Sequence, residues 1–226
     1  MAALVETVRA ELAARARPDK APDTQAYLKS AMPLYGVPRA GHREIARALP
    51  PLEGFGAWRD FVLTLWRGAV HREERYVALD VIALPRYRGF RTMRALPLYE
   101  ELIVTGAWWD LVDPVATRRL EELWPDVVPV LREWSVGEDM WLRRSAILAQ
   151  VHRKADTDFA LLAELIEPNR GDREFFIRKA IGWALREYSK TDPAAVVAYC
   201  ESHELSGLSR REALKRIAAG PARPAA

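Results

Sequence analysis

The sequence has few of the residues that bind metals or form cross-links. Its 226 residues include one cysteine, Cys200, and four histidines. A single cysteine excludes an internal disulfide and any zinc site built from several cysteines, and it suits the reducing cytoplasm. No histidine has another histidine four residues away, as a helical zinc motif requires. We therefore expect neither a metal nor another cofactor.

Long apolar runs and glycine-rich phosphate loops are also absent from the sequence. No apolar stretch approaches the length that spans a membrane, so we expect no membrane partner. Residues 1–17 carry Glu6, Arg9 and Glu11 inside an apolar pattern, which is typical of an amphipathic helix rather than a signal peptide. The formal net charge is only +3, so net charge does not indicate what kind of partner the protein binds. The 34 basic residues are nevertheless enough to line one face.

Helical periodicity covers almost the whole chain, and strand patterns are nearly absent. Glycines and prolines interrupt the periodic stretches where short helix connections would lie. Residues 1–220 form a single predicted domain, and residues 221–226 have the composition of a frayed tail. Besides the N-terminal helix, the pattern predicts helices at about 24–33, 42–49, 57–68, 72–85, 93–104, 108–123, 126–134, 138–153, 157–167, 173–189, 193–203 and 209–219.

Local motifs predict two helix starts and several exposed faces. Asp192 before Pro193 predicts a capped helix start, and Ser209 with Glu212 predicts a capping box that opens the last helix. Adjacent acids diverge on a helix, so we expect acid pairs to lie on solvated faces. The pairs are Glu73 and Glu74, Glu100 and Glu101, and Glu121 and Glu122.

Five helical segments repeat at a nearly constant spacing. Their small residues are separated by 34, 34, 34 and 33 positions, which is within the range of solenoids built from paired helices. We therefore predict an all-α fold, a curved right-handed solenoid of HEAT-like antiparallel helix pairs. The concave surface of such an array suits duplex DNA if it is basic. The small residues are Ala78, Val112, Ala146, Ala180 and Ala213.

The position after each small residue is aliphatic in four copies and acidic in one. The acidic copy is Asp113; the others are Leu79, Ile147, Ile181 and Leu214. A charge at a core position is costly, so either a functional site or a buried pair with an arginine of a neighbouring helix must explain it. Trp109 lies four residues earlier and shares a helix face with Asp113. An aromatic ring and a carboxylate together suit a substrate that is or becomes cationic.

Five segments distributed along the chain match one known family. They are Tyr27–Lys29, Leu98–Asp113, Trp141–Leu148, Glu174–Thr191 and Glu204–Lys215, and the fourth reads EFFIRKAIGWALREYSKT. On these segments the chain resembles the AlkD-like family of DNA glycosylases, which are HEAT-like repeat enzymes of DNA alkylation repair. The chain departs from the family after Val37, where Pro38 follows at once and residues 39–41 intervene before the pattern resumes.

The resemblance implies hydrolysis of the N-glycosidic bond of a cationic 3- or 7-alkylated purine in duplex DNA. It also implies that Asp113 is the catalytic carboxylate and that Trp109 and Trp183 form an aromatic wall at the lesion. Tyr27 would add an aromatic contact from the N-terminal part. Because a cationic base leaves without being protonated, an ionised Asp113 is expected to stabilise the oxocarbenium charge on the sugar and to position water.

For DNA phosphates the resemblance implies Arg144, and Arg143, Arg178 and Lys179 are further candidates. The repeat register disagrees with the resemblance on two points. It places Arg143, rather than Arg144, on the same helix face as Trp109, and it places Trp183 on a different face from Trp109. For both assignments we follow the resemblance.

Two alternatives to a methylpurine glycosylase stay open at the level of sequence. One is a non-catalytic HEAT-like module that binds damaged DNA or a protein partner. The other is a glycosylase specialised for bulky natural-product adducts. In each case we expect a cytoplasmic monomer, associated with the nucleoid when it is bound to DNA.

Overall fold

The computed structural model describes residues 1–219, and the predicted tail at 221–226 lies outside them. Within the described residues the regular structure consists of thirteen α-helices and five short 3-10 helices, without a strand. The chain divides into two compact units, residues 1–98 and residues from 99 onward, which are described separately. The single domain over residues 1–220 therefore stays a prediction. No helix in the described range is long and apolar enough to cross a membrane.

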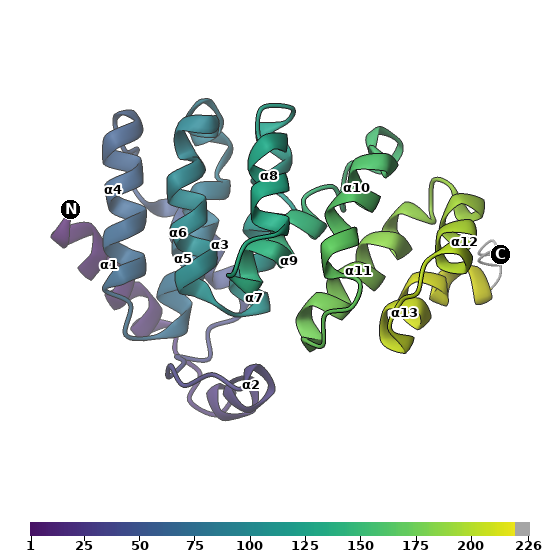
Figure 1. Cartoon of the computed structure of the whole chain (residues 1–226). Coiled ribbons are helices and arrows are strands. Elements are labelled where there is room, and N and C mark those ends of the chain that lie inside the picture. Colours follow the sequence, from purple (N-terminus) through teal and green to yellow (C-terminus); the bar gives the residue numbers. More distant parts are fainter. Residues whose placement is uncertain (220–226) are drawn as a thin grey trace, which may run out of the picture. The chain divides into compact units, whose positions relative to one another are not determined.

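The first unit is built around α3, α4 and α5, with α1 packed against all three (Figure 1). Its core contains the fully buried aromatic side chains of Trp58, Phe61 and Trp66, as expected for tryptophans at helical spacing. Its helices are α1 (Ala2–Ala14), α2 (Ala21–Leu28), α3 (Arg39–Ala48), α4 (Gly54–Arg67) and α5 (Arg72–Ala83), followed by 3-10 helices at Pro85–Phe90 and Met93–Ala95. Helix α6 (Leu96–Gly106) continues from this unit into the next.

The acids Glu73 and Glu74 are buried in this unit, so the prediction that they lie on a solvated face is wrong. Glu74 Oε1 accepts a hydrogen bond from His71 N at 2.9 Å, and Glu74 Oε2 accepts one from Arg9 Nε at 2.9 Å. Glu73 Oε1 accepts one from Gly36 N at 2.7 Å. Both carboxylates satisfy backbone donors at the start of α5 and in the loop before α3, which compensates their burial.

The second unit consists of two rows of helices. Helices α7, α9, α11 and α13 pack side by side in chain order, while α8, α10 and α12 pack on them and complete the pairs (Figure 1). This arrangement is a helical-repeat solenoid, as the spacing predicts; its hand and curvature stay predictions. The helices are α7 (Trp109–Ala116), α8 (Val128–Ser135), α9 (Met140–Leu148), α10 (Phe159–Ile166), α11 (Phe175–Tyr188), α12 (Pro193–Ser202) and α13 (Gly207–Ala218), with 3-10 helices at Glu121–Leu123, Lys154–Asp156 and Glu167–Asn169.

The repeat positions read from the sequence are core positions. The five small side chains are all fully buried, each on a different helix, and these helices are α5, α7, α9, α11 and α13. The aliphatic residues that follow Ala146 and Ala180 are fully buried as well. Asp113 therefore lies at a position that the other copies use for packing.

Helix boundaries differ from the prediction where local chemistry ends or begins a helix. Helix α7 ends at Ala116 instead of 123; Pro114 lies inside it, where it lacks the N–H that would donate to the carbonyl of Asp110. The capping residue of α13 is Ser206, whose side chain accepts from Ser209 N at 3.1 Å, so the capping box predicted at Ser209 is wrong. The cap predicted at Asp192 is confirmed, since its side chain accepts from Ala195 N at 2.9 Å.

Candidate functional site

Asp113 lies on α7, one helical turn after Trp109 on the same face. Its side chain is 14% exposed, so it is not completely enclosed by protein. The backbone carbonyl of Asp113 accepts hydrogen bonds from Thr117 N at 2.9 Å and from Thr117 Oγ1 at 2.8 Å, which fixes the end of this short helix. The position of Asp113 is thus set by a well-bonded backbone.

Arg144 of α9 forms a bidentate ion pair with Asp113. Its Nε donates to Asp113 Oδ1 and its Nη2 donates to Asp113 Oδ2, each at 2.8 Å. Its Nη1 donates to the carbonyl oxygen of Phe176 on α11 at 2.5 Å, and the arginine side chain is only 5% exposed. One arginine therefore links α7, α9 and α11, and it is the neighbouring-helix arginine that the sequence offered as one explanation for a charge at position 113.

The pKa of Asp113 is raised above the usual value of an aspartate. The largest cause is burial, which disfavours the charged form; the hydrogen bonds and the charge of Arg144 oppose it, and the nearby Asp110 raises the pKa further. A bidentate arginine occupies one lone pair on each carboxylate oxygen. Each oxygen keeps another lone pair, which can accept a hydrogen bond from water or lie against a cation.

Phe176 connects Arg144 to a cluster of three aromatic side chains. Trp108, Trp141 and Phe176 pack on one another with ring centroids 5.0–6.3 Å apart, and the guanidinium carbon of Arg144 lies 5.9 Å from the centroid of the Phe176 ring. Trp108 and Trp141 therefore have a packing role. The sequence does not identify Phe176 as a site residue, because every residue has a backbone carbonyl and residue type does not show which one accepts from an arginine.

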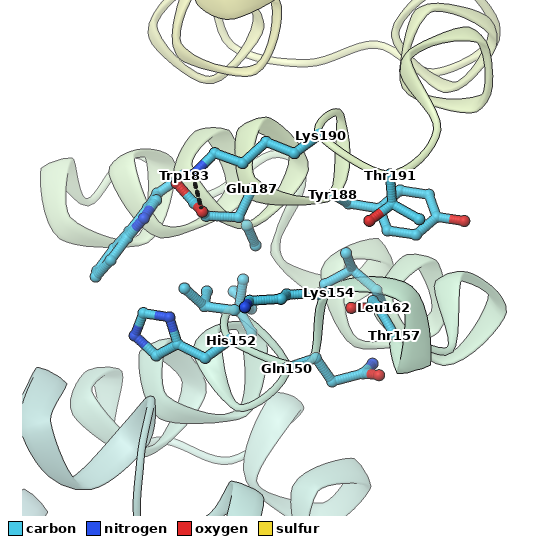
Figure 2. A pocket seen from close by; sticks show the side chains of 13 residues that line it. Gln150, His152, Lys154, Thr157, Leu162, Trp183, Glu187, Tyr188, Lys190 and Thr191 are labelled. Carbon is cyan, nitrogen blue, oxygen red and sulfur yellow. Dashed lines mark hydrogen bonds and ion pairs between the residues drawn. The ribbon is translucent and has the colours of Figure 1, made fainter.

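Trp183 lies apart from the ion pair, in a pocket of about 510 Å³. It is seven residues after Phe176 on α11, which corresponds to a rise of roughly 10 Å along the helix. Figure 2 shows its indole beside His152, with Glu187 and Lys190 paired one turn further along. The pKa of His152 is lowered, first by burial and then by Arg118. The wall formed by Trp109 and Trp183 together stays a prediction.

The other basic candidates are not gathered around Asp113. Arg143 donates to the carbonyl oxygens of the loop before α9 and pairs with Asp172 at 3.1 Å. Lys179 pairs with Glu212 of α13 at 3.0 Å, and the Nε of Arg178 is buried without a hydrogen-bond partner. Their phosphate-binding roles stay predictions.

Tyr27 belongs to the first unit, and its side chain is 73% exposed. Its role as an aromatic contact to DNA likewise stays a prediction. Within residues 1–219 no three histidine, cysteine or acidic side chains are grouped closely enough to hold a metal ion.

Comparison with known proteins gives matches along both units. Residues 8–217 match a family model described as "DNA alkylation repair enzyme". A solved structure described as "Predicted DNA alkylation repair enzyme from Enterococcus faecalis" superposes with a TM-score of 0.79 and 28% sequence identity, covering 90% of this chain and 97% of that one. No curated protein matches the chain.

Proposed function

Since the chain belongs to the DNA alkylation repair enzyme family, we propose that it hydrolyses the N-glycosidic bond of cationic 3- or 7-alkylated purines in duplex DNA. Family membership gives the chain a role in DNA repair; the substrate and the reaction are our proposal. The observation that carries it is the carboxylate of Asp113, held in a defined orientation by two hydrogen bonds from Arg144, on a side chain that is 14% exposed.

An alkyl group on N3 or N7 gives the purine a positive charge, so the base is already a good leaving group. When the bond between C1′ and the base nitrogen breaks, its electron pair goes to the base, which departs neutral, and positive charge develops on the deoxyribose. An ionised Asp113 stabilises that charge and accepts a hydrogen bond from the attacking water. The water oxygen bonds to C1′, and its proton leaves to Asp113 or to solvent. Trp109, one turn away, favours a cationic base by about 0.5–2 kcal/mol.

Arg144 acts in this proposal as a positioning residue. Burial makes ionisation of Asp113 harder, and the guanidinium opposes that effect and fixes the orientation of the carboxylate. Three of its five N–H groups are engaged, by Asp113 and by the carbonyl of Phe176. A phosphate contact by Arg144 would have to use the remaining two, on a side chain that is almost fully buried.

The proposal is tested with duplexes that differ in one base. We expect release of free base from a duplex with a single 7-methylguanine or 3-methyladenine, and no release from the same duplex with guanine or with neutral hypoxanthine at that position. Equal release of hypoxanthine, or release of no cationic lesion, would contradict the proposed substrate class. A duplex with a bulky cationic adduct, run in parallel, shows whether release depends on the size of the alkyl group.

A second function is favoured by the ion pair itself. A buried carboxylate bound by an arginine is also a way to join two helices, and a non-catalytic module that binds damaged DNA or a protein partner needs nothing more from Asp113. That reading predicts retention of alkylated duplex with no free base after long incubation, and a substitution of Asp113 that changes stability alone.

A further inference from the structure

Three arginines form a line on the exposed side of α3 in the first unit. Arg39, Arg43 and Arg47 follow one another at intervals of four residues, and all three are exposed. Four residues correspond to a rise of about 6 Å, so the guanidinium groups start from positions about 6 Å apart along one helix face. We call these residues the α3 arginine stripe. Its first member lies in the 38–41 segment, where the sequence departs from the family pattern.

The buried face of α3 fixes the direction of the stripe. His42, Ile45 and Ala46 are buried there, and α3 packs against α1 and α5. Pro38 precedes the helix with extended backbone, so helical geometry begins at Arg39 and brings that residue into register with the other two. The apolar face is thus anchored, and the arginines are left on the solvent side.

Little negative charge compensates the stripe. Asp80 of α5 faces all three arginines, and its carboxylate lies 3.9 Å from Arg43 Nε. Burial raises the pKa of Asp80 to about 6 despite the three arginines, so this carboxylate is largely ionised at pH 7 and still leaves one negative charge against three positive ones. Glu44, the only acid within α3, is exposed and forms no ion pair with Arg47.

The stripe is not needed to cap its own helix. Arg86 donates to the carbonyl oxygens of Ala46 and Leu49 at 3.3 and 2.9 Å, and at 3.4 Å to that of Arg47. These bonds satisfy the C-terminal carbonyls of α3, for which a basic residue in the last turn is often used. The side chains of Arg39 and Arg47 have no hydrogen-bond or ion-pair partner in the described part of the chain. Each pair of like charges four residues apart destabilises a helix by a few tenths of a kcal/mol, so an anionic ligand would reduce the repulsion between these arginines.

We propose that the α3 arginine stripe is a binding site for the phosphate backbone of duplex DNA. One strand of B-DNA advances about 3.4 Å along the axis per phosphate, so the 12 Å line of arginines spans about three to four phosphates. Arginine suits this ligand, because its planar fork binds phosphate oxygens in pairs. The inference rests on the proposed function for the choice of DNA as the anion, and it concerns binding alone.

The test measures binding of undamaged duplex by the full chain over 0.1 to 1 M salt, so it does not depend on base release. Each lost phosphate contact removes about 0.9 from the slope of log K against log salt, so Arg39→Gln with Arg47→Gln should lower the slope by about 1.8. The same rule gives about 60-fold weaker binding at 0.1 M salt, with the difference vanishing toward 1 M. Replacement of both residues by lysine should restore most of the slope.

The matched control removes two exposed arginines elsewhere, Arg59 on α4 and Arg132 on α8, which pair with Asp60 and Glu164. We expect this pair of glutamine substitutions to leave the slope nearly unchanged. Equal losses for the two double variants would show that only total charge matters and would overturn the proposal. So would an unchanged DNA slope combined with stripe-dependent binding to vesicles of anionic phospholipid. If the chain releases no base but its salt slope still depends on the stripe, the proposed reaction is refuted while the proposed DNA-binding site is supported.

Discussion

At the scale of single residues, the chemistry of the chain is concentrated where a charge replaces an aliphatic side chain. Asp113 occupies a packing position of the repeat, and Arg144 makes that tolerable by neutralising it with two hydrogen bonds. Removing one partner of such a buried pair typically costs about 3–5 kcal/mol, because it leaves the other charge uncompensated. The stability of a variant at either position must therefore be measured before its activity is interpreted.

Asp80 provides a residue-scale prediction on pH and stability. Its pKa is about 6 in the folded chain against an ordinary 3.8, so the folded state holds the proton more tightly and stability falls as pH rises through this window. Asp80→Asn removes the buried charge. We expect it to raise the free energy of unfolding at pH 7 by about 2–3 kcal/mol and to have almost no effect below pH 4.

Chemical denaturation at pH 7 and pH 4, with amide exchange in α3 and α5 as the local readout, measures this difference. Asp60→Asn is the control, because Asp60 is half exposed and paired only with a neighbouring exposed arginine. A destabilised Asp80→Asn variant at pH 7 would mean that the arginines outweigh burial.

At the scale of helices, α11 and α13 approach each other closely at Gly182. A Cβ atom added at Gly182 would lie 2.5 Å from Glu212 Cβ and 2.9 Å from the carbonyl oxygen of Ser209. Glu212 is also the carboxylate shared by Lys179 and Arg186, so it has little freedom to move. The glycine thus permits both the helix contact and the ion pairs across it.

Gly182→Ala should therefore lower the free energy of unfolding by about 1–3 kcal/mol, in spite of the better helix propensity of alanine. Gly56→Ala is the matched control: Gly56 lies inside α4, and nothing is within 4 Å of the added Cβ, so the change should stabilise by about 0.5–1 kcal/mol. Thermal or denaturant unfolding of the two variants tests the difference in sign. Equal effects at the two positions would show that the helices separate without cost.

Much of this helical architecture could be predicted from the sequence, because apolar residues at helical spacing and a 34-residue period are local or repeated signals. The partner of Asp113 could not be chosen, since Arg143 and Arg144 are adjacent and point about 100° apart on α9; only the packed structure shows that Arg144 faces α7. The burial of Glu73 and Glu74 was missed for a related reason. Their partners are backbone groups, which residue identity does not reveal, and Arg9, which is distant in the sequence.

At the scale of the whole molecule, the family match spans both units, and each contributes a different candidate element. The second unit holds the ion-paired carboxylate and its aromatic surroundings. The first holds the α3 arginine stripe and the exposed Tyr27. The proposed chemistry and the proposed binding of the DNA backbone thus lie in different units, and the two can be tested independently on the full chain.

The most direct test of the central claim is the single-turnover rate of 7-methylguanine release by Asp113→Asn, measured with all duplex bound and with the folded fraction checked. We expect a rate about 100 to 1000 times lower than that of the wild-type chain, with duplex affinity retained, because the group that stabilises the sugar cation is gone. Asp110→Asn, one turn earlier on α7, should release base at nearly the wild-type rate. Equal release by the wild-type chain and a folded Asp113→Asn variant would contradict the account.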